Sequence, residues 1–425
     1  MNARSFKVYP YRWVVLIAYM LICLVISIQW LTHAPIARAA EVYYQGQFNP
    51  YSVINIDFLA MIYMLIYLIF SIPASYVIDT WGIKRGIGIG AAICGISALM
   101  KGIFADSFTA QVIFQIGLAI SQPFILNALT ALTARWFPME ERGTAAGLGT
   151  LAQYLGIIIV MMVTPLMVVT NPALVNYGDG IQRMLMIYGI ITFLACLAAI
   201  LLIREEPPTP PAEKAYERHS FHEGFKYIFR QKDMLITIAI FFIGLGIFNA
   251  VSSMTDSIAE YLKVKDSDGM IGGIMLIGGI IGAIILPILS DKFRKRKAFL
   301  VICIAGMLPS MSGIAFAGVV TATPEAAYTM ALISSFFLGF FVMSAGPIGF
   351  QYAAEVSYPA PESTSQGLLL LAGQITGMLF VAGMSIRANA FLPFFMKLFV
   401  VLGAIIFITS LFLKESKPLQ DYYSK

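Results

Sequence analysis

The sequence predicts an all-α integral membrane protein with twelve transmembrane helices, arranged as two similar halves of six. Three observations predict it: the composition, the number of long apolar segments, and a charged motif that recurs half a chain later. Hydrophobic residues make up 59% of the 425 residues and charged residues only 12%, whereas soluble domains carry about 25% charged residues. A chain this apolar is typical of a protein that resides in a lipid bilayer.

Twelve apolar segments are long enough to cross about 30 Å of hydrocarbon as helices. We expect spans at residues 11–36, 54–78, 86–104, 108–133, 143–169, 181–203, 232–255, 269–290, 298–320, 327–350, 364–387 and 391–413. The first segment is long and lacks a small-residue cleavage site, so we expect a retained helix and not a signal peptide.

A charged motif supports the division into halves. Residues 79–85 (DTWGIKR) and 291–297 (DKFRKRK) each separate two apolar segments, and they lie 212 residues apart, half of the chain. We expect each to form a cytoplasmic turn of about seven residues. A repeat at half the length indicates that one helix bundle was doubled, although tight cytoplasmic turns in general collect Lys and Arg.

Two further pairs repeat with an offset of 221 residues. Pro138 corresponds to Pro359, and Gln153 corresponds to Gln374. Equivalent positions of two such halves are expected to face each other across a pseudo-twofold axis. We therefore expect a pseudo-twofold bundle of six plus six helices with the substrate at the membrane midplane between the halves.

Residues 1–203 and 232–425 are the expected six-helix bundles, the second with a short cytoplasmic tail, and residues 204–231 the linker between them. The linker begins with a proline-rich run, residues 207–211, which cannot continue a helix. Residues 221–230 then resemble a short amphipathic helix at the membrane surface.

The distribution of basic residues predicts the orientation. With the N-terminus in the cytoplasm, 21 of the 28 Lys and Arg residues fall on the cytoplasmic side and seven on the other. This excess predicts that both termini are cytoplasmic. The same excess of Lys and Arg on the cytoplasmic side accounts for the net charge of +5, so we expect no nucleic-acid partner. We expect a monomer in the plasma membrane.

Cofactor and metal chemistry find no support in the sequence. The four Cys lie in four different spans without a CxxC pair, and the three His form no cluster with metal spacing. We expect no cofactor, no metal and no catalytic residues, because no span carries a nucleophile–base pair. The Cys are expected to pack in the helix interior.

Charged residues near the spans suggest passive transport. The acids lie toward the outer ends (Asp57, Asp256, Glu260) or toward the cytoplasmic side (Asp79, Asp291, Glu355). Proton relays need acids within the membrane, so we expect a facilitator and not a tightly proton-coupled pump. Lys101, near the outer end of its span, is expected to extend its stem to the outer surface.

Polar and aromatic side chains mark a candidate cavity. Trp30 follows Gln29 and precedes His33 near the end of the first span, which is typical of a wet cavity, although Trp also anchors helices at the membrane interface. Gln122 precedes Pro123 in the fourth span and is expected to face the bundle interior. There it either contacts a ligand or makes a helix–helix hydrogen bond.

The motif Asp-x-x-Gly-x-Lys/Arg between the second and third spans, with a weaker copy between the eighth and ninth, resembles the major facilitator superfamily. The resemblance covers nearly the whole chain and implies the major facilitator fold. Several stretches resemble the feline leukaemia virus subgroup C receptor family of choline- and haem-linked transporters. They are 29–30 (QW), 56–67 (IDFLAMIYMLIY), 122–126 (QPFIL), 355–359 (EVSYP), 367–369 (GLL) and Gln374.

By this resemblance, the ligand residues of the family fall on Trp30, Gln122 and Gln374. We expect Tyr67 as a second aromatic wall and Gln153 and Asn249 as further neutral contacts; Asn249 stands where the family has a tyrosine. Aromatic walls with uncharged amides suit a small organic cation or zwitterion, such as a choline-like amine, through cation–π attraction.

The superfamily resemblance also implies a cytoplasmic gate. Asp79 is expected to bind the start of the eleventh span near Ser363-Thr364, and Asp291 the start of the fifth near Gly143-Thr144, because a carboxylate is favoured at a helix N-terminus. The full set expected at the gate is Asp79, Gly82, Lys84, Arg85, Arg142, Asp291, Arg296 and Glu355.

We therefore predict a secondary transporter with alternating access and a small-molecule substrate. The alternatives are a proton-coupled symporter of a small organic anion, which would need a basic residue deep in a span, and a non-transporting receptor or sensor. The longest cytoplasmic stretch, about 28 residues, is short for a signalling domain.

Overall fold

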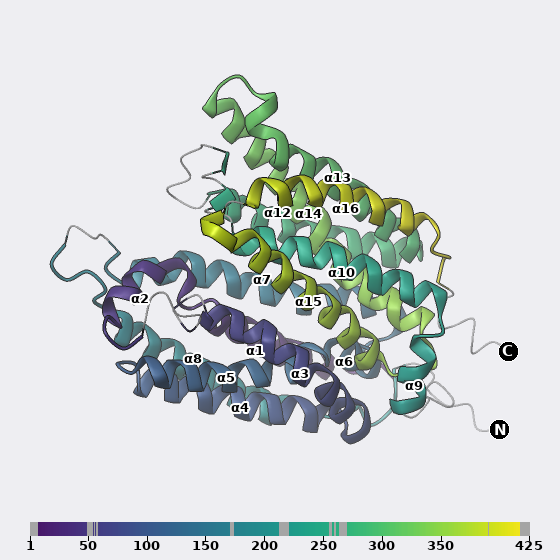
Figure 1. Cartoon of the computed structure of the whole chain (residues 1–425). Helices are drawn as coiled ribbons and strands as arrows, with labels where there is room; N and C mark the ends of the chain where they lie inside the picture. Colours follow the sequence, from purple (N-terminus) through teal and green to yellow (C-terminus); the bar gives the residue numbers. More distant parts are fainter. Residues whose placement is uncertain are drawn as a thin grey trace, which may run out of the picture. The chain divides into compact units, whose positions relative to one another are not determined.

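The structure is a computed structural model that describes residues 7–48, 54, 56, 58–170, 174–211, 221–254, 257–258, 261–262, 270–389 and 391–416. The described part of the chain is built from helices and their connections, without strands. Within these residues, twelve helical spans are long and apolar enough to cross a membrane, as the sequence predicts. Figure 1 shows the helices coloured along the chain.

The first six spans lie close to the predicted segments. They are α1 (Tyr11–Trp30, continued by η1, Ala34–Ile36), α3 (Phe58–Trp81), α4 (Ile83–Ile103), α5 with α6 (Phe108–Leu126 and Leu129–Trp136), α7 (Arg142–Met167) and α8 (Ile181–Leu202). Two short elements, α2 (Ala37–Tyr43) and η2 (Met139–Glu141), lie in connections. The second six are α10 (Lys232–Ser253), α12 (Met270–Phe293), α13 (Arg296–Val320), α14 (Pro324–Val356), α15 (Glu362–Asn389) and α16 (Leu392–Leu411). A short helix, α9 (Phe221–Ile228), precedes α10.

The expected seven-residue turns at the charged motifs are wrong. Helix α3 continues to Trp81 and α4 begins at Ile83, so that Gly82 alone joins them; Arg294 and Lys295 join α12 to α13. The charged residues lie within the helix ends, because a helix can continue past the apolar core with its polar side chains in the interface. Gly82 has φ 98° and Arg294 has φ 54°, and this left-handed backbone reverses the chain within one or two residues.

By its contacts, the chain separates into two compact units. The first unit is residues 1–136 and 149–211, and the second is residues 137–148 and 212–425. The first turns of α7 thus group with the second unit and its remainder with the first. Residues 204–211 belong to the first unit and α9 to the second, so the expected linker is divided between them.

The two units repeat the same helix pairings. In the first unit α5 packs on α3 and α4, and α8 packs on α1 and α4. In the second unit α14 packs on α12 and α13, and α16 packs on α10 and α13. These pairs correspond one to one along the chain, which is the structural form of the half-chain repeat.

Glycines allow α12 and α14 to approach closely (Figure 1). A Cβ at Gly278 or Gly282 of α12 would overlap the carbonyl oxygen of Phe336 or Phe340 on α14. A Cβ at Gly339 of α14 would in turn overlap the carbonyl oxygen of Met275. Small residues let two helix backbones meet in a membrane, where packing and not hydrophobicity drives association.

Replacing Gly339 by Val tests this contact. We expect Gly339→Val to lower the free energy of unfolding by roughly 1–3 kcal/mol, because the backbone of α12 leaves no room for the side chain. The thermal unfolding midpoint in detergent measures the effect. Gly273→Ala on α12 is the matched control, since a Cβ there meets no described atom within 4 Å; equal midpoints for the two variants would contradict the close contact.

Candidate functional site

Trp30 lies half-buried at the end of α1 and faces α3. Its indole N–H donates to the carbonyl oxygen of Ala60 at 3.1 Å, and its ring centroid lies 6.3 Å from that of Tyr63, with the planes tilted by 40°. The Tyr63 hydroxyl is buried and has no hydrogen-bond partner in the described chain. Trp30 is thus held in place by its nitrogen while part of its ring stays accessible.

Tyr67, the second expected aromatic wall, is fully buried in a polar network. Its hydroxyl donates to Oδ1 of Asn127, and Nδ2 of Asn127 donates to Oγ of Ser75 at 3.0 Å and to the carbonyl oxygen of Ser71 at 3.1 Å. Asn127 stands at the break between α5 and α6, four residues after Pro123. These hydrogen bonds connect the α5–α6 break to α3, and the Tyr67 hydroxyl already has a partner in Asn127.

Gln122 and Gln153 belong to the same unit. Gln122 is 6% exposed, and its Oε1 is buried with no partner among the described residues. Gln153 is half-buried on α7, one turn before Gly156, where α7 approaches the carbonyl oxygen of Leu24 on α1. A buried amide oxygen without a donor carries an energetic cost that a ligand or water can relieve.

Asn249 and Gln374 lie in the second unit on two packed helices, α10 and α15. Asn249 is 8% exposed and abuts Gly377, one turn after Gln374. Asn249 Nδ2 and Gln374 Oε1 are buried, and neither is paired in the part of the chain that the structure describes. The second unit thus presents an unpaired donor and an unpaired acceptor close together along α15.

Lys101 corrects one expectation. It does not reach the outer surface: it is 1% exposed, and its Nζ donates to Oε1 of Gln115 at 2.7 Å. The Cα–Cβ bond of a helical residue tilts toward the helix N-terminus, so a lysine in the last turn of α4 extends back along the helix. A lysine side chain reaches beyond the end of its helix more easily from the first turn than from the last turn.

Gln115 connects this lysine to two other helices. Its Nε2 donates to the carbonyl oxygen of Leu59 at 3.0 Å and lies 3.4 Å from those of Gln29 and Trp30. The Gln29 side chain turns away from Trp30 and donates to Thr192 of α8 at 3.0 Å. Gln115 is not among the site residues expected from the sequence, although Gln111 and Gln115 stand four residues apart, on one face of a membrane helix.

The charged residues of the second unit form a buried cluster at the start of α13. Arg296 donates to Asp291 through Nη1 and to Oε1 of Glu355 through Nε at 3.3 Å. Thr144 at the start of α7 donates to Oδ2 of Asp291 at 3.0 Å, so the contact expected from the superfamily resemblance is present. Its gating role stays a prediction. Arg142 donates to the carbonyl oxygen of Phe137 at 3.2 Å.

In the first unit a carboxylate caps α4. Glu205 accepts from the backbone N–H groups of Ile83 at 3.2 Å and Lys84 at 2.9 Å, and it pairs with Arg135. Gly82 has φ 98°, a backbone conformation that favours glycine, and a Cβ there would also meet this carboxylate. Glu415 repeats the arrangement in the second unit, accepting from Lys297 N–H at 2.8 Å.

The remaining expected gate residues are less constrained. The side chains of Lys84 and Arg85 are exposed. Asp79 lies in the first unit and Ser363-Thr364 in the second, and their contact stays a prediction. Asp57, Asp256 and Glu260 lie outside the described residues.

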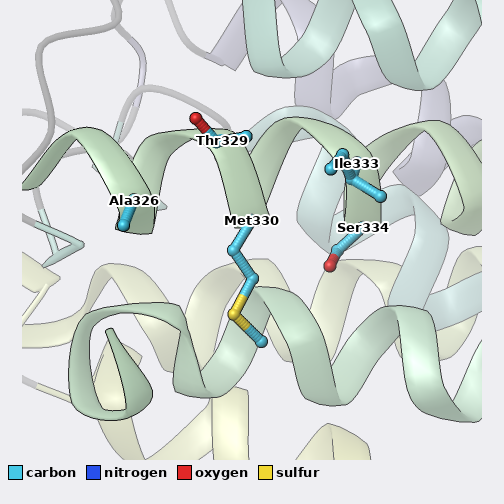
Figure 2. Close-up of a pocket in the computed structure, with 5 residues that line it drawn as sticks. All are labelled: Ala326, Thr329, Met330, Ile333 and Ser334. Carbon is cyan, nitrogen blue, oxygen red and sulfur yellow. The ribbon is translucent and has the colours of Figure 1, made fainter. Parts of the chain in front are cut away.

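The structure also has a surface hollow on α14, whose lining contains no residue of the expected substrate or gate set. Figure 2 shows its lining, Ala326, Thr329, Met330, Ile333 and Ser334, all from one helix. None of these side chains is titratable, and none belongs to the expected substrate or gate set.

The fold and the charged motifs together identify the class of protein. The Major Facilitator Superfamily profile matches residues 14–381, most of the chain. The protein belongs to the major facilitator superfamily of secondary membrane transporters.

Several relatives are similar over most of their length. An uncharacterized MFS-type transporter of Caenorhabditis elegans, C09D4.1, is 27% identical over 98% of this chain and 72% of its own. Solute carrier family 49 member A3 of Xenopus tropicalis is 29% identical over 89% of this chain and 78% of its own. The choline/ethanolamine transporter FLVCR1 of Felis catus is 29% identical over 87% of this chain and 66% of its own.

Solved structures support the fold. The proton:xylose symporter XylE has a TM-score of 0.75 at 16% identity, covering 97% of this chain and 99% of its own. FucP in the outward conformation has a TM-score of 0.72 at 15% identity, covering 95% and 100%. At these identities the similarity shows the twelve-helix fold alone.

The Asp291 contact generates a prediction about gating. We expect Asp291→Asn to change the transport rate several-fold while leaving ligand selectivity unchanged, because one charge–helix contact contributes about 0.3–2 kcal/mol to the balance of two states. A cysteine introduced at Ala146, near the start of α7, should change its reaction rate with a membrane-impermeant maleimide. The four native cysteines are buried and contribute little background.

Glu325→Gln is the matched control for this experiment, since Glu325 is exposed at the start of α14. If Asp291→Asn leaves both turnover and labelling at the control level, Asp291 only neutralises Arg296 and orients the turn.

Proposed function

We propose that this major facilitator transporter moves a small organic cation or zwitterion, of the choline or ethanolamine class, by alternating access. The observation that carries the proposal is the combination of a half-buried Trp30 ring with unpaired buried amide atoms on Gln122, Asn249 and Gln374. The relatives named as choline/ethanolamine transporters support the same substrate class.

The chemistry of the residues fits such a solute. A quaternary ammonium has no hydrogen-bond donor on its nitrogen, so it is recognised by the face of an aromatic ring. The indole of Trp30 is fixed through its N–H to Ala60, which prevents the ring from turning when a cation binds. The substrate hydroxyl group then supplies the donor that the Oε1 atom of Gln122 or Gln374 lacks.

Asn249 differs in kind from the two glutamines because its unpaired atom is a donor. A donor suits the carboxylate or hydroxyl oxygen of a zwitterion, whereas a tyrosine at this position would extend an aromatic cage. The replacement therefore broadens the proposal to zwitterions.

The runner-up is a small organic anion. Lys101, a buried ammonium in α4, favours it, since an anion needs a basic residue inside the bundle. Its hydrogen bond to Gln115 occupies one of its three N–H donors, and two remain for a carboxylate.

We also propose that the protein resides in the plasma membrane with both termini in the cytoplasm, supported by the excess of basic residues at the expected inner ends of the spans.

Binding measurements test the proposal. A thermal-shift screen of amines, amino acids and carboxylates on the purified protein should select choline-like compounds, because a ligand at 100 times its dissociation constant stabilises by about 2.7 kcal/mol. Trp30→Ala, Gln122→Ala and Gln374→Ala should each raise the dissociation constant, the two amide variants about two- to tenfold for one lost hydrogen bond. Isothermal calorimetry measures the change.

Trp13→Ala and Gln182→Ala are matched controls, because both side chains are exposed. Wild-type affinity in all three site variants would contradict the assigned cavity, and selective stabilisation by carboxylates would favour the anion.

A further inference from the structure

Lys101 is a buried cation that substrate recognition does not use. It is 1% exposed, and its Nζ donates a hydrogen bond to the neutral oxygen of Gln115. No carboxylate of the described residues forms an ion pair with it. A buried charge is costly unless it is paired, and a group in this position tends to give up its charge. A lysine can do so by releasing a proton.

A second basic group lies beside it. His33, at the end of the first span, is 3% exposed, and neither ring nitrogen has a hydrogen-bond partner in the described chain. Gln115, which binds Lys101, also lies 3.4 Å from the carbonyl oxygens of Gln29 and Trp30, one turn before His33. An imidazole accepts and donates a proton at its two nitrogens, so His33 is chemically suited to carry a proton in this region.

The other titratable side chains near the end of α4 are less suited to exchanging a proton, because they already donate hydrogen bonds or are exposed. From α2 and the turn after it come Tyr43 and Tyr44, which donate to Asp106 and to the Ala105 carbonyl oxygen. Burial, followed by the nearby Asp106, raises the pKa of Tyr43 to about 12, and burial raises that of Tyr44 as well. Asp106 itself is exposed in the turn after α4.

The elements packed against α4 complete this set. From α3 comes Tyr63, from α4 itself Cys94, and from α5 the uncharged Gln111 and Gln115. From α8 come Cys196, the exposed Arg183, and Tyr188, whose hydroxyl lies 2.9 Å from Thr164 Oγ1. Lys101 and His33 are therefore the groups at this place suited to exchanging a proton.

The pair is connected to the candidate cation site by a single amide group. Gln115 accepts from Lys101 through Oε1, and its Nε2 lies 3.4 Å from the Trp30 carbonyl oxygen and 3.0 Å from that of Leu59. Loss of the proton from Lys101 leaves a neutral amine that can still donate to this amide, but the hydrogen bond is no longer charge-assisted and is weaker. The orientation of Gln115 thus links the charge on Lys101 to the backbones of α1 and α3 beside Trp30.

We propose that Lys101 and His33 form a proton-binding site and that the transporter exchanges one proton for one organic cation. This inference rests on the proposed function, since it takes the cation as the substrate. Two positive charges in the same low-dielectric bundle repel each other, so that protonated Lys101 disfavours a cation at Trp30. Cation binding is accompanied by release of one proton from the ammonium of Lys101 through His33 to water, and the total charge of the site is conserved.

Gln111 favours a proton over a bound inorganic anion at this place. Its Nε2 donates to the carbonyl oxygen of Lys101 at 2.9 Å, and its Oε1 is buried and unpaired among the described residues; the oxygen of Gln115 accepts from Lys101 Nζ. Amide oxygens repel an anion but stabilise an ammonium. The expectation of a facilitator considered carboxylates alone, and Lys101 and His33 supply the proton-binding group that it found missing.

Proteoliposomes containing the wild-type protein test the exchange without a variant. Choline counterflow at equal pH on both sides first establishes that choline is carried. An interior one pH unit more acidic than the exterior should then drive choline accumulation toward about tenfold, the limit for one-for-one exchange. An internal pH dye should report alkalinisation of the interior as choline enters.

Variants of Lys101 and His33 test whether these residues cause the proton-driven accumulation of choline. Lys101→Met should retain counterflow within about threefold but lose proton-driven accumulation, and its choline affinity should no longer rise with pH. Lys101→Arg keeps its charge at all working pH values and should bind choline about tenfold or more weakly. His33→Gln should slow proton-driven choline accumulation while leaving choline counterflow at equal pH unchanged. Lys397→Met, at an exposed lysine of α16, is the matched control and should behave as wild type.

Each alternative outcome is decisive. Counterflow without proton-driven accumulation or dye response in the wild type overturns the exchange and leaves the proposed function intact. Absence of choline counterflow overturns both. Choline affinity that depends on chloride and not on pH overturns the proton site in favour of an anion site.

Discussion

The structure depends on one constraint: a polar group inside a membrane bundle must find its partner within the protein. Asn127 satisfies it by binding Tyr67, Ser71 and Ser75 across α3 and the α5–α6 break. Gln115 satisfies it by joining Lys101 to the backbones of α1 and α3. Buried amide atoms on Gln111, Gln122, Asn249 and Gln374 stay unpaired among the described residues, and we propose the last three as contacts of the solute.

The same constraint operates at the helix ends. Near the ends of the two halves, Glu205 accepts two backbone N–H groups at the start of α4 and Glu415 accepts one at the start of α13. Carboxylates neutralise the exposed donors and the positive end of a helix. The repeat thus extends from the motif acids to the segment that follows each sixth span. The residues expected at the gate and those inside the bundle make the same kind of contact, in which a polar side chain satisfies a neighbouring polar group.

The direction of a side chain decides what a charged residue does. Lys101 in the last turn of α4 extends inward because helical side chains lean toward the N-terminus, and it meets Gln115 instead of the interface. In the exchange that we propose, Lys101 is the proton-binding group, and Gln115 connects it to the backbone beside Trp30. Such a coupling would need no carboxylate in the middle of a span.

The sequence alone determined the twelve spans, the half-chain repeat and the superfamily, because apolar length and recurring charged motifs are local properties of the chain. It also predicted the contact of Asp291 with the start of α7, through the superfamily resemblance. It placed the motif acids in loops, whereas the helices continue through them, since periodicity does not show where a helix ends. Only the tertiary structure paired Tyr67 with Asn127 and buried Lys101 against Gln115, because which side chains meet depends on how separate helices face one another.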